Sequence, residues 1–403
     1  MNTKLIKRKI ANIITAFFNQ LNLKNIILME SWPTYSDNSK YVFDEMIRQG
    51  VNQNYKIIWN VFSHDTTAID NYDAIREELT ENKNVKVLNA YCGNSVKKLL
   101  TRIYKLYVFS TAKVMIICNH HIKKRRADQI YINLTHGSPL KCIKSHGYGS
   151  PVWTDYLVRL SDVFEENLKE PEKNNAQYVT LGYPRNDDLF NEKIDLHSVF
   201  EDRAFDKVIY WMPTWRQHSL NGKSVTSSSS VPIIHDENKA IEVNEFARES
   251  NVLLVLKPHF SQDVSKFNKI DLSNIIFITN DFLEKKNVLN YELLRSVDAL
   301  ITDYSSVYYD YLLCDKPIGL CWEDFDEFNQ KEGFAVDINK MLSGGEKLYD
   351  VNDLCSFIER VSTNQDLLKK QRHDNLKLAH KYSDNMSSKR VVDFIVNLLE
   401  KEL

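Results

Sequence analysis

The sequence predicts an α/β protein built from two doubly wound domains, and three observations indicate this fold class. The chain has 403 residues, more than one ordinary core accommodates, and suits two domains of about 150–200 residues each. Several runs are apolar without interruption, as at residues 252–256, which is typical of strands buried on both faces of a parallel sheet. Helical patterns alternate with these runs, as in strand–helix–strand units.

Strands are expected wherever a β-branched or aromatic run is bounded by turn residues. In the first half of the chain these runs are residues 25–30, 56–62, 85–90, 114–119, 129–135, 155–160 and 177–182. In the second half they are residues 207–212, 252–257, 275–279, 299–302 and 317–322.

We place the domain boundary after Asp187, so that residues 1–187 form the first domain and residues 188–403 the second. The polar stretch 218–236 contains four consecutive serines and is expected to be a surface loop of the second domain. Helical patterns from 351 to 403 predict terminal helices. These are assigned to the second domain, with packing back across the first domain as the other option.

Composition excludes several classes of protein. Lys and Arg total 52 against 54 Asp and Glu, and the net charge of −2 argues against bulk nucleic-acid binding, which needs a basic excess. The six cysteines are scattered without a CxxC pair, so neither a disulfide framework nor a zinc site is predicted, and a reducing cytosol is expected. We recognise no secretory signal and no uncharged apolar run of about 18 residues that would span a membrane.

The first 21 residues predict an amphipathic helix. Apolar side chains, Phe17 and Phe18 among them, recur at helical spacing, and basic residues cluster from Lys4 to Lys9. A basic amphipathic helix with aromatic residues is typical of an anchor that lies in the membrane interface. A helix packed on its own domain explains the same pattern, and both interpretations stay open at this point.

The strongest candidate site is a strand that runs into Thr302-Asp303-Tyr304-Ser305-Ser306, with a helical pattern directly after it. Ser305 is expected to cap this helix, so that free backbone N–H groups and hydroxyls form a cradle for phosphate. Ligands of open α/β sheets bind at the carboxyl ends of strands, where this turn is expected. An ordinary capped helix is the competing interpretation.

A second candidate is His136, at the end of another predicted strand and before Gly137 and Ser138. A histidine in this position is well placed to act as a general base near neutral pH. The glycine lets a ligand approach the backbone, and Lys141 adds positive charge. A structural histidine remains the alternative.

Further polar groups follow other predicted strands. Lys257 and His259 end one strand, and Arg216 follows Pro213 and Thr214 after another. Cations at such positions neutralise phosphate oxygens and a leaving oxyanion.

Two other features have weaker support. Glu323 and Asp324 follow a strand and could hold the hydroxyls of a sugar or polyol, although a solvated acidic loop fits equally well. The basic run 123–126 could contact anionic lipid head groups, or form a charged surface loop. No metal site is predicted, because no histidine or acidic pair has partners at ligand spacing.

Five motifs, taken in order, resemble the CDP-glycerol glycerophosphotransferase family, the teichoic-acid primases and polymerases of bacterial envelopes. They are His-Gly-Ser-Pro-Leu-Lys at 136–141, Gly-Tyr-Pro-Arg-Asn-Asp at 182–187, Pro-Thr-Trp-Arg at 213–216, Lys-Pro-His at 257–259 and Thr-Asp-Tyr-Ser-Ser at 302–306. Glu-Ser at 30–31 with Ser-Asp-Asn at 36–38, and the segments 322–328 and 333–337, are similar as well. Thr135 and Ser138 depart from the family pattern, where Trp and Thr are usual.

The resemblance implies a GT-B fold, with two Rossmann-like domains that face each other across a cleft. It also implies a CDP-polyol donor bound mainly by the second domain, an acceptor bound by the first, and neither metal nor cofactor. By position, the catalytic residues would be His136, which deprotonates the acceptor hydroxyl, and His259. The donor would be held by Pro213, Thr214, Arg216, Lys257, Thr302, Asp303, Ser305 and Ser306. The acceptor side or its support would include Gly137, Ser138, Lys141, Arg185, Asp187, Glu323 and Asp324.

The activity that this resemblance implies is transfer of glycerol phosphate from CDP-glycerol to a hydroxyl of a lipid-linked or polymeric acceptor, with release of CMP. The acceptor would be a teichoic acid or a capsule polymer, and the protein would act at the inner face of the cytoplasmic membrane as a peripheral protein. CDP-ribitol is an alternative donor. A GT-B glycosyltransferase or a sugar-nucleotide epimerase is an alternative enzyme, and a non-catalytic relative is a third interpretation.

Overall fold

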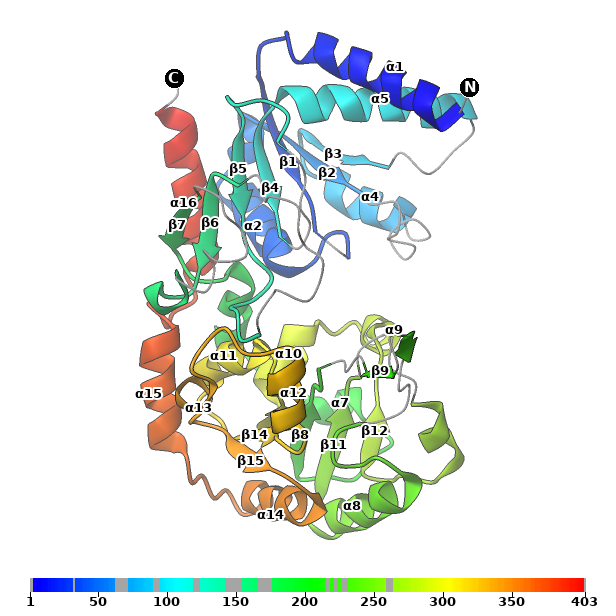
Figure 1. Ribbon diagram of the computed structural model, residues 1–403, viewed down its shortest axis with the longest axis vertical. Helices are drawn as coiled ribbons and strands as arrows, with labels where there is room; N and C mark the ends of the chain where they lie inside the picture. Colours follow the sequence, from blue (N-terminus) through cyan, green and yellow to red (C-terminus); the bar gives the residue numbers. More distant parts are fainter. Residues whose placement is uncertain are drawn as a thin grey trace. The chain divides into compact units, whose positions relative to one another are not determined.

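The chain folds into two compact units, which the computed structural model in Figure 1 describes over residues 3–31, 33–61, 72–89, 95–118, 124–141, 154–165, 176–214, 218–220, 223–225, 231–258 and 264–401. The first unit consists of Met1–His136, Gly149–Asp187 and Met386–Leu403. The second consists of Gly137–Tyr148 and Asp188–Asn385. The chain leaves the first unit after His136, returns to it at Gly149 and leaves it again after Asp187, where the sequence places the boundary. Two assignments were wrong: residues 386–403 belong to the first unit, and residues 137–148 to the second.

The first unit is built on a seven-stranded sheet in the order β3-β2-β1-β4-β5-β6-β7, in which every neighbouring pair is parallel. The strands are β1 (Lys24–Met29), β2 (Lys56–Asn60), β3 (Val85–Leu88), β4 (Ala112–Ile117), β5 (Ile130–Asn133), β6 (Tyr156–Arg159) and β7 (Gln177–Thr180). The order reverses between β1 and β4, which creates the topological switch point where open α/β sheets bind ligands.

Helices flank this sheet. They are α1 (Thr3–Phe18), α2 (Asp37–Arg48), α4 (Tyr72–Thr80), α5 (Ser95–Thr111) and α16 (Ser387–Glu400), with the short 3₁₀ segments η1 (Val51–Gln53) and η3 (Asp162–Phe164). α1 lies beside α5, and α16 lies beside α2 (Figure 1). In the part of the chain that the structure describes, no helix combines the length and apolar character needed to cross a membrane.

The segment from Gly182 to Asp187 explains why α16 belongs to the first unit. The Asp187 carboxylate accepts the backbone N–H groups of Ser387 at 2.8 Å and Ser388 at 2.7 Å, which satisfies two donors at the start of α16. Gly182 has a φ of +84°, and a Cβ there would stand 2.4 Å from the Ser387 hydroxyl oxygen. Val391 is one of the apolar residues that α16 buries. Asp187, predicted on the acceptor side, therefore serves as a helix cap.

The second unit contains a six-stranded parallel sheet in the order β12-β11-β8-β13-β14-β15. Its strands are β8 (Lys207–Trp211), β11 (Val252–Leu256), β12 (Ile275–Phe277), β13 (Ala299–Thr302), β14 (Ile318–Cys321) and β15 (Glu346–Leu348). Here too the order reverses once, between β8 and β13, so that each unit has the strand order of a Rossmann-type domain.

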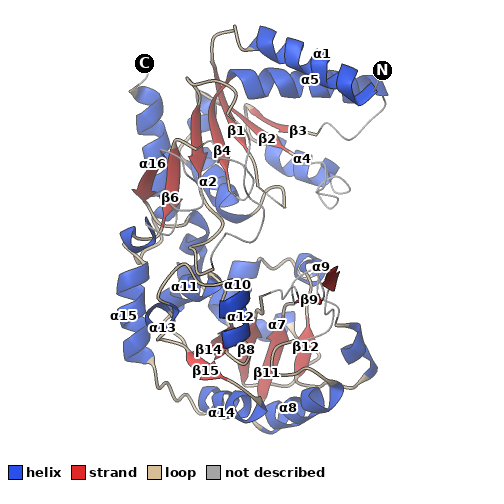
Figure 2. Ribbon diagram, viewed as in Figure 1, coloured by secondary structure: helices blue, strands red, loops and turns tan. Residues whose placement is uncertain are grey.

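The helical segments of the second unit cover this sheet, and α8 packs against α14 (Figure 2). The α-helices are α7 (Leu196–Val199), α8 (Glu237–Glu249), α9 (Asn280–Lys285), α10 (Asn290–Ser296), α11 (Val307–Tyr311), α12 (Phe325–Lys331), α13 (Ile338–Met341), α14 (Val351–Ser362) and α15 (Lys369–Ala379). The 3₁₀ segments are η5 (Ser265–Lys269) and η6 (Leu312–Cys314), and η4 (Pro184–Phe190) spans the change of unit. Buried apolar residues of β8, β11 and β13 form one core cluster with α8 and α14.

Each run predicted as a strand overlaps one, but three strands among the described residues were not predicted. The stretch 218–236, expected to be a loop, includes the antiparallel pair β9 (His218–Leu220) and β10 (Lys223–Val225). β15 was missed as well. These strands are only three residues long and contain polar side chains, so they lack the apolar run that reveals a buried strand.

Candidate functional site

In the first unit, the neighbouring strands β1, β4 and β5 bring Asp37 and His136 together. Asp37 opens α2 shortly after β1 ends, and His136 follows the end of β5. The His136 Nδ1 atom lies 2.5 Å from Asp37 Oδ2, and the ring itself is exposed. A carboxylate on Nδ1 orients the imidazole and leaves Nε2 free to take a proton, which is the arrangement of a general base.

Arg185 holds this pair in place. Its guanidinium Nη1 donates to Asp37 Oδ1 at 2.7 Å and to the His136 carbonyl at 2.6 Å. The backbone N–H of Arg185 donates to the Asn38 side chain at 3.1 Å, and Asn38 in turn donates to the Thr135 carbonyl at 2.9 Å. Arg185 is buried, so these contacts form a rigid support beneath the exposed imidazole.

Asp37 stays ionised in this setting. Burial opposes its charge, but the charges and hydrogen bonds of Arg185 and His136 outweigh burial and hold the pKa of the Asp37 carboxyl well below its usual range. Asp37 has a φ of +53° and Thr135 a φ of +56°, left-handed conformations that cost free energy in residues other than glycine and cluster at functional sites. Asp37 was noted in a motif but given no role, because an acidic residue in the first turn of a helix is an ordinary feature.

In the second unit, the strands β11, β8, β13 and β14 lie side by side, and their carboxyl ends meet at one edge of the sheet. Residues singled out in the sequence therefore follow neighbouring strands: Lys257 after β11, Thr214 after β8, the segment 302–306 at the end of β13 and Glu323 after β14. The segment after β8 and the segment after β13 flank the point where the strand order reverses. The topology thus gathers at one edge most of the residues that the sequence predicts on the donor side.

The turn after β13 divides into a structural part and an open part. The buried Asp303 carboxylate accepts the backbone N–H of Thr214 at 2.8 Å and also its hydroxyl, and the Thr302 hydroxyl donates to the Met212 carbonyl at 2.9 Å. These bonds hold the ends of β8 and β13 together.

Ser305 and Ser306 form the open part of the turn. Both are half-buried, and neither hydroxyl has a hydrogen-bond partner among the described residues. The first residue before α11 is Ser306 and not Ser305, so the predicted cap was wrong by one position, and the Ser306 side chain makes no cap hydrogen bond. Both hydroxyls are consequently available to a ligand.

Lys257 carries a half-buried ammonium group directly after β11. Burial lowers the pKa of Lys257 below its ordinary value, and its Nζ atom has no hydrogen-bond or ion-pair partner in the part of the chain that the structure describes. A cation withdrawn from water without a counter-ion costs free energy, which an anion bound beside it would recover. Lys257 and the two serine hydroxyls thus supply charge and hydrogen-bond donors of the kind that a pyrophosphate requires.

Glu323 and Asp324 have contacts within the second unit. Glu323 accepts the Ile233 N–H at 3.0 Å and lies 2.8 Å from the His235 ring. Ile233 has a φ of +67°, a strained conformation for a β-branched residue that the Glu323 contact helps to hold. Asp324 accepts the Tyr304 hydroxyl at 3.2 Å. Both carboxylates thus have structural contacts, and a role in holding the hydroxyls of a polyol stays a prediction.

Other predicted residues are placed as follows. Gly137, Ser138 and Lys141 belong to the second unit, where Ser138 is buried and the Lys141 ammonium lies 5.5 Å from the Phe328 ring centroid. Pro213 is buried at the end of β8. Arg216 and His259 lie outside the described residues, so their roles stay predictions.

No group of three or more His, Cys, Asp and Glu side chains that could hold a metal ion occurs among the residues described. A reaction without metal or cofactor remains a prediction from the sequence.

With this geometry established, the chain was compared with known proteins. The family model for CDP-Glycerol:Poly(glycerophosphate) glycerophosphotransferase matches residues 13–397. The chain belongs to this glycerophosphotransferase family. The resemblance inferred from the five motifs is thereby confirmed, and so is the assignment to an enzyme family of transferases.

Two relatives and one solved structure illustrate the similarity. A teichoic acid poly(glycerol phosphate) polymerase of Staphylococcus epidermidis is 25% identical over 350 residues, which are 79% of this chain and 43% of that protein. One of Bacillus spizizenii is 24% identical over 347 residues, 80% of each chain. The structure of the wall teichoic acid polymerase TagF superposes with a TM-score of 0.70 at 20% identity, covering 99% of this chain and 96% of that one. The chain thus has the predicted fold class, while spanning less than half of its Staphylococcus relative.

The contacts of Asp37 generate a prediction about the candidate base His136. We expect Asp37→Asn to lower kcat/KM about a hundredfold or more, because the amide no longer stabilises the imidazolium or fixes the tautomer of His136. Steady-state kinetics would measure this, with thermal unfolding to show that the variant is folded. Asp44→Asn, on the same helix but paired with Lys40, serves as the control and should retain activity. Equal activity of both variants would contradict the assignment.

Lys257 generates a second prediction. We expect Lys257→Met to bind CDP about tenfold or more weakly by calorimetry, since a charge-assisted hydrogen bond contributes about 1.5–3 kcal/mol. Because the pKa of Lys257 is lowered, the native protein should lose affinity as the pH rises through that pKa, below the range where an exposed lysine loses its proton. Lys257→Arg should bind CDP without this alkaline loss, and Lys370→Met, at an exposed position, should behave as native. CDP affinity that is insensitive to Lys257→Met would overturn the role.

Proposed function

We propose that this chain transfers glycerol phosphate from CDP-glycerol to a hydroxyl group of a polymeric or lipid-linked envelope acceptor and releases CMP. The observation that carries the proposal is the His136–Asp37 pair, which has the composition and the 2.5 Å contact of a general base. Family membership supplies the reaction class. The named relatives act on teichoic acid, which supports an acceptor of that kind here.

The chemistry follows from these groups. The acceptor hydroxyl oxygen attacks the β-phosphorus of CDP-glycerol, while His136 Nε2 takes the hydroxyl proton. A P–O bond to the acceptor forms as the bond between the β-phosphorus and the bridging oxygen breaks, and CMP leaves with that oxygen. Ionised Asp37 stabilises the imidazolium, and Lys257, Ser305 and Ser306 offset the charge of the pyrophosphate. Phosphoryl transfer asks a protein for positioning and charge stabilisation of this kind.

A panel of nucleotide donors tests the proposal. Incubation with CDP-glycerol, CDP-ribitol, a UDP-sugar and a GDP-sugar should release CMP from CDP-glycerol, and His136→Ala should abolish release while retaining CDP-glycerol binding. Release of CMP from CDP-ribitol alone would identify the ribitol enzyme instead. Release of UDP or GDP would replace the proposal by a glycosyltransferase or an epimerase, for which the same Rossmann-type sheets would serve.

We also propose that α1 and α5 dock the protein on an anionic membrane surface. α1 contacts α5 through Phe18 and Tyr107, whose ring centroids are 5.5 Å apart. It nevertheless leaves Ile13 and Phe17 70% and 62% exposed, and Leu100 of α5 is 61% exposed. Exposed large apolar side chains concentrated on two adjacent helices are typical of an interaction surface.

The charges of the two helices favour a membrane as the occupant of this surface. Neither helix sequence contains an aspartate or a glutamate. The basic residues on them include Lys7, Arg8, Lys9, Lys97, Lys98, Arg102 and Lys105. Apolar groups beside basic residues, without acidic ones, match the boundary between acyl chains and anionic head groups.

Membrane docking predicts that Ile13→Asp with Phe17→Asp reduces co-sedimentation with vesicles that contain phosphatidylglycerol by about tenfold or more, and that added salt weakens native binding. Leu289→Asp with Leu367→Asp changes two exposed apolar residues of the second unit and is the control. Sedimentation that is unaltered in the α1 variant would show that this helix only packs on its own unit.

A further inference from the structure

A cavity of about 160 Å³ lies in the first unit between β3 and α5. β3 is the edge strand of the sheet, separated from β5 and His136 by β2, β1 and β4. The cavity is therefore not part of the site described above. Its volume far exceeds the ~10–15 Å³ of such space that one water molecule needs, so that a group of the size of a phosphate can enter. We call it the β3–α5 pocket.

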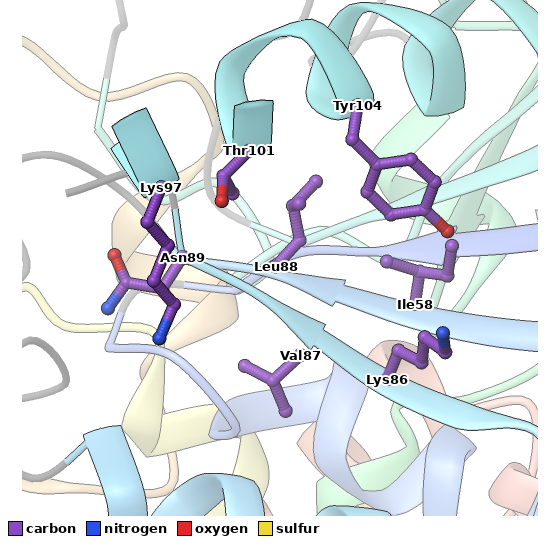
Figure 3. A pocket seen from close by; sticks show the side chains of 8 residues that line it. All are labelled: Ile58, Lys86, Val87, Leu88, Asn89, Lys97, Thr101 and Tyr104. Carbon is purple, nitrogen blue, oxygen red and sulfur yellow. The ribbon is translucent and has the colours of Figure 1, made fainter. Parts of the chain in front are cut away.

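The polar groups of the β3–α5 pocket suit an anion. Among the described residues, the polar side chains that line it are Lys86, Asn89, Lys97, Thr101 and Tyr104, the other described lining residues are apolar, and no carboxylate belongs to this described lining. Figure 3 shows Lys97, Asn89 and Thr101 toward one end, with Lys86 and Tyr104 toward the other. Ammonium, amide N–H and hydroxyl groups are the donors that phosphate oxygens accept.

Two further details support an anionic ligand. Burial raises the pKa of Tyr104, against the opposing charge of Lys86, so the phenol stays a hydrogen-bond donor at neutral pH. Lys56 places another ammonium 6.0 Å from the Tyr104 ring centroid. Cations of β3 and α5 thus line the pocket, and one of β2 lies beside its Tyr104 ring.

The pocket lies beside exposed apolar residues of α5. Lys97, Thr101 and Tyr104 recur at intervals of four and three residues, so they share one side of the helix. Leu100, which is 61% exposed, follows Lys97 by three residues and precedes Tyr104 by four, and is therefore the surface neighbour of both. A ligand that fits this place has a phosphate beside an apolar chain, which describes a phospholipid at the water–acyl boundary.

We propose that the β3–α5 pocket binds the phosphate head group of an anionic glycerophospholipid. The proposal deepens the membrane docking proposed above and rests on it: α1 and α5 provide general attraction to the bilayer, and the pocket selects the head group. Recognition at a defined pocket makes binding depend on where the positive charges lie, whereas general attraction depends mainly on how many there are.

Charge placement provides the experiment. Lys86→Glu with Lys97→Glu should weaken binding to phosphatidylglycerol vesicles about tenfold more than Lys98→Glu with Arg102→Glu, which changes net charge equally but lies outside the pocket. Thr101→Phe, which fills the pocket without changing charge, should also weaken binding about fivefold. Circular dichroism and thermal unfolding establish that each variant is folded. Equal losses in the two charge variants, together with native binding by Thr101→Phe, would overturn the proposal.

A soluble lipid separates this proposal from membrane docking itself. Dihexanoyl phosphatidylglycerol, kept monomeric, should bind the native protein and the Ile13→Asp, Phe17→Asp variant alike, and the Lys86→Glu, Lys97→Glu variant at least about tenfold more weakly. Lack of native binding, or binding that ignores the pocket residues, would refute the head-group site even if vesicles still bind. Soluble binding without vesicle binding would refute docking alone. Inorganic phosphate that competes as well as the lipid would identify a free-phosphate site and overturn the lipid assignment.

Discussion

The buried ion pair between Asp37 and Arg185 is the interaction on which the first unit's site depends. It joins three segments that are distant in sequence: the loop after β1, the end of β5 and the segment 182–187. An ion pair of this kind, desolvated but bonded to several partners, contributes specificity of position more than net stability. Here it fixes the carboxylate, and the carboxylate fixes the imidazole. The exposed His136 ring thus has a defined orientation, although the ring itself packs against little.

The two units position their polar residues with the same sheet topology. Both sheets reverse their strand order once, and in both the polar residues collect where strands end near that reversal. In each unit some of these groups hold the backbone, as Asp303 does for Thr214. Others remain open, as do Ser305 and Ser306. Polar groups that hold the backbone rigidly, next to polar groups that are open to a ligand, suit phosphoryl transfer, because positioning supplies most of its catalysis.

Most of the fold could be predicted from the sequence, since long apolar runs reveal strands buried on both faces. His136, Lys257 and the serines could be found too, because their position at strand ends is a local property. The role of Asp37 could not, because its partners lie 99 and 148 positions away in the chain. The same reason applies to Glu323 and Asp187, which the sequence assigns to the acceptor side or its support and whose carboxylates contact distant backbone N–H groups. Whether a carboxylate has a structural role or binds a ligand depends on its tertiary contacts.

The return of α16 to the first unit has a consequence for how the protein is made. The last stretch of chain covers part of a domain whose other segments are synthesised first, and Asp187 receives the start of α16 only after the whole second unit has been translated. The second unit's main segment, Asp188–Asn385, is continuous and precedes that helix. It can therefore fold during synthesis, while the surface of α2 in the first unit is not yet covered by α16. Domains generally fold as units in order of synthesis, whereas the topology of this chain allows the second unit to be completed before the first. A ribosome that stalls near the end would release a protein whose N-terminal half is unfinished.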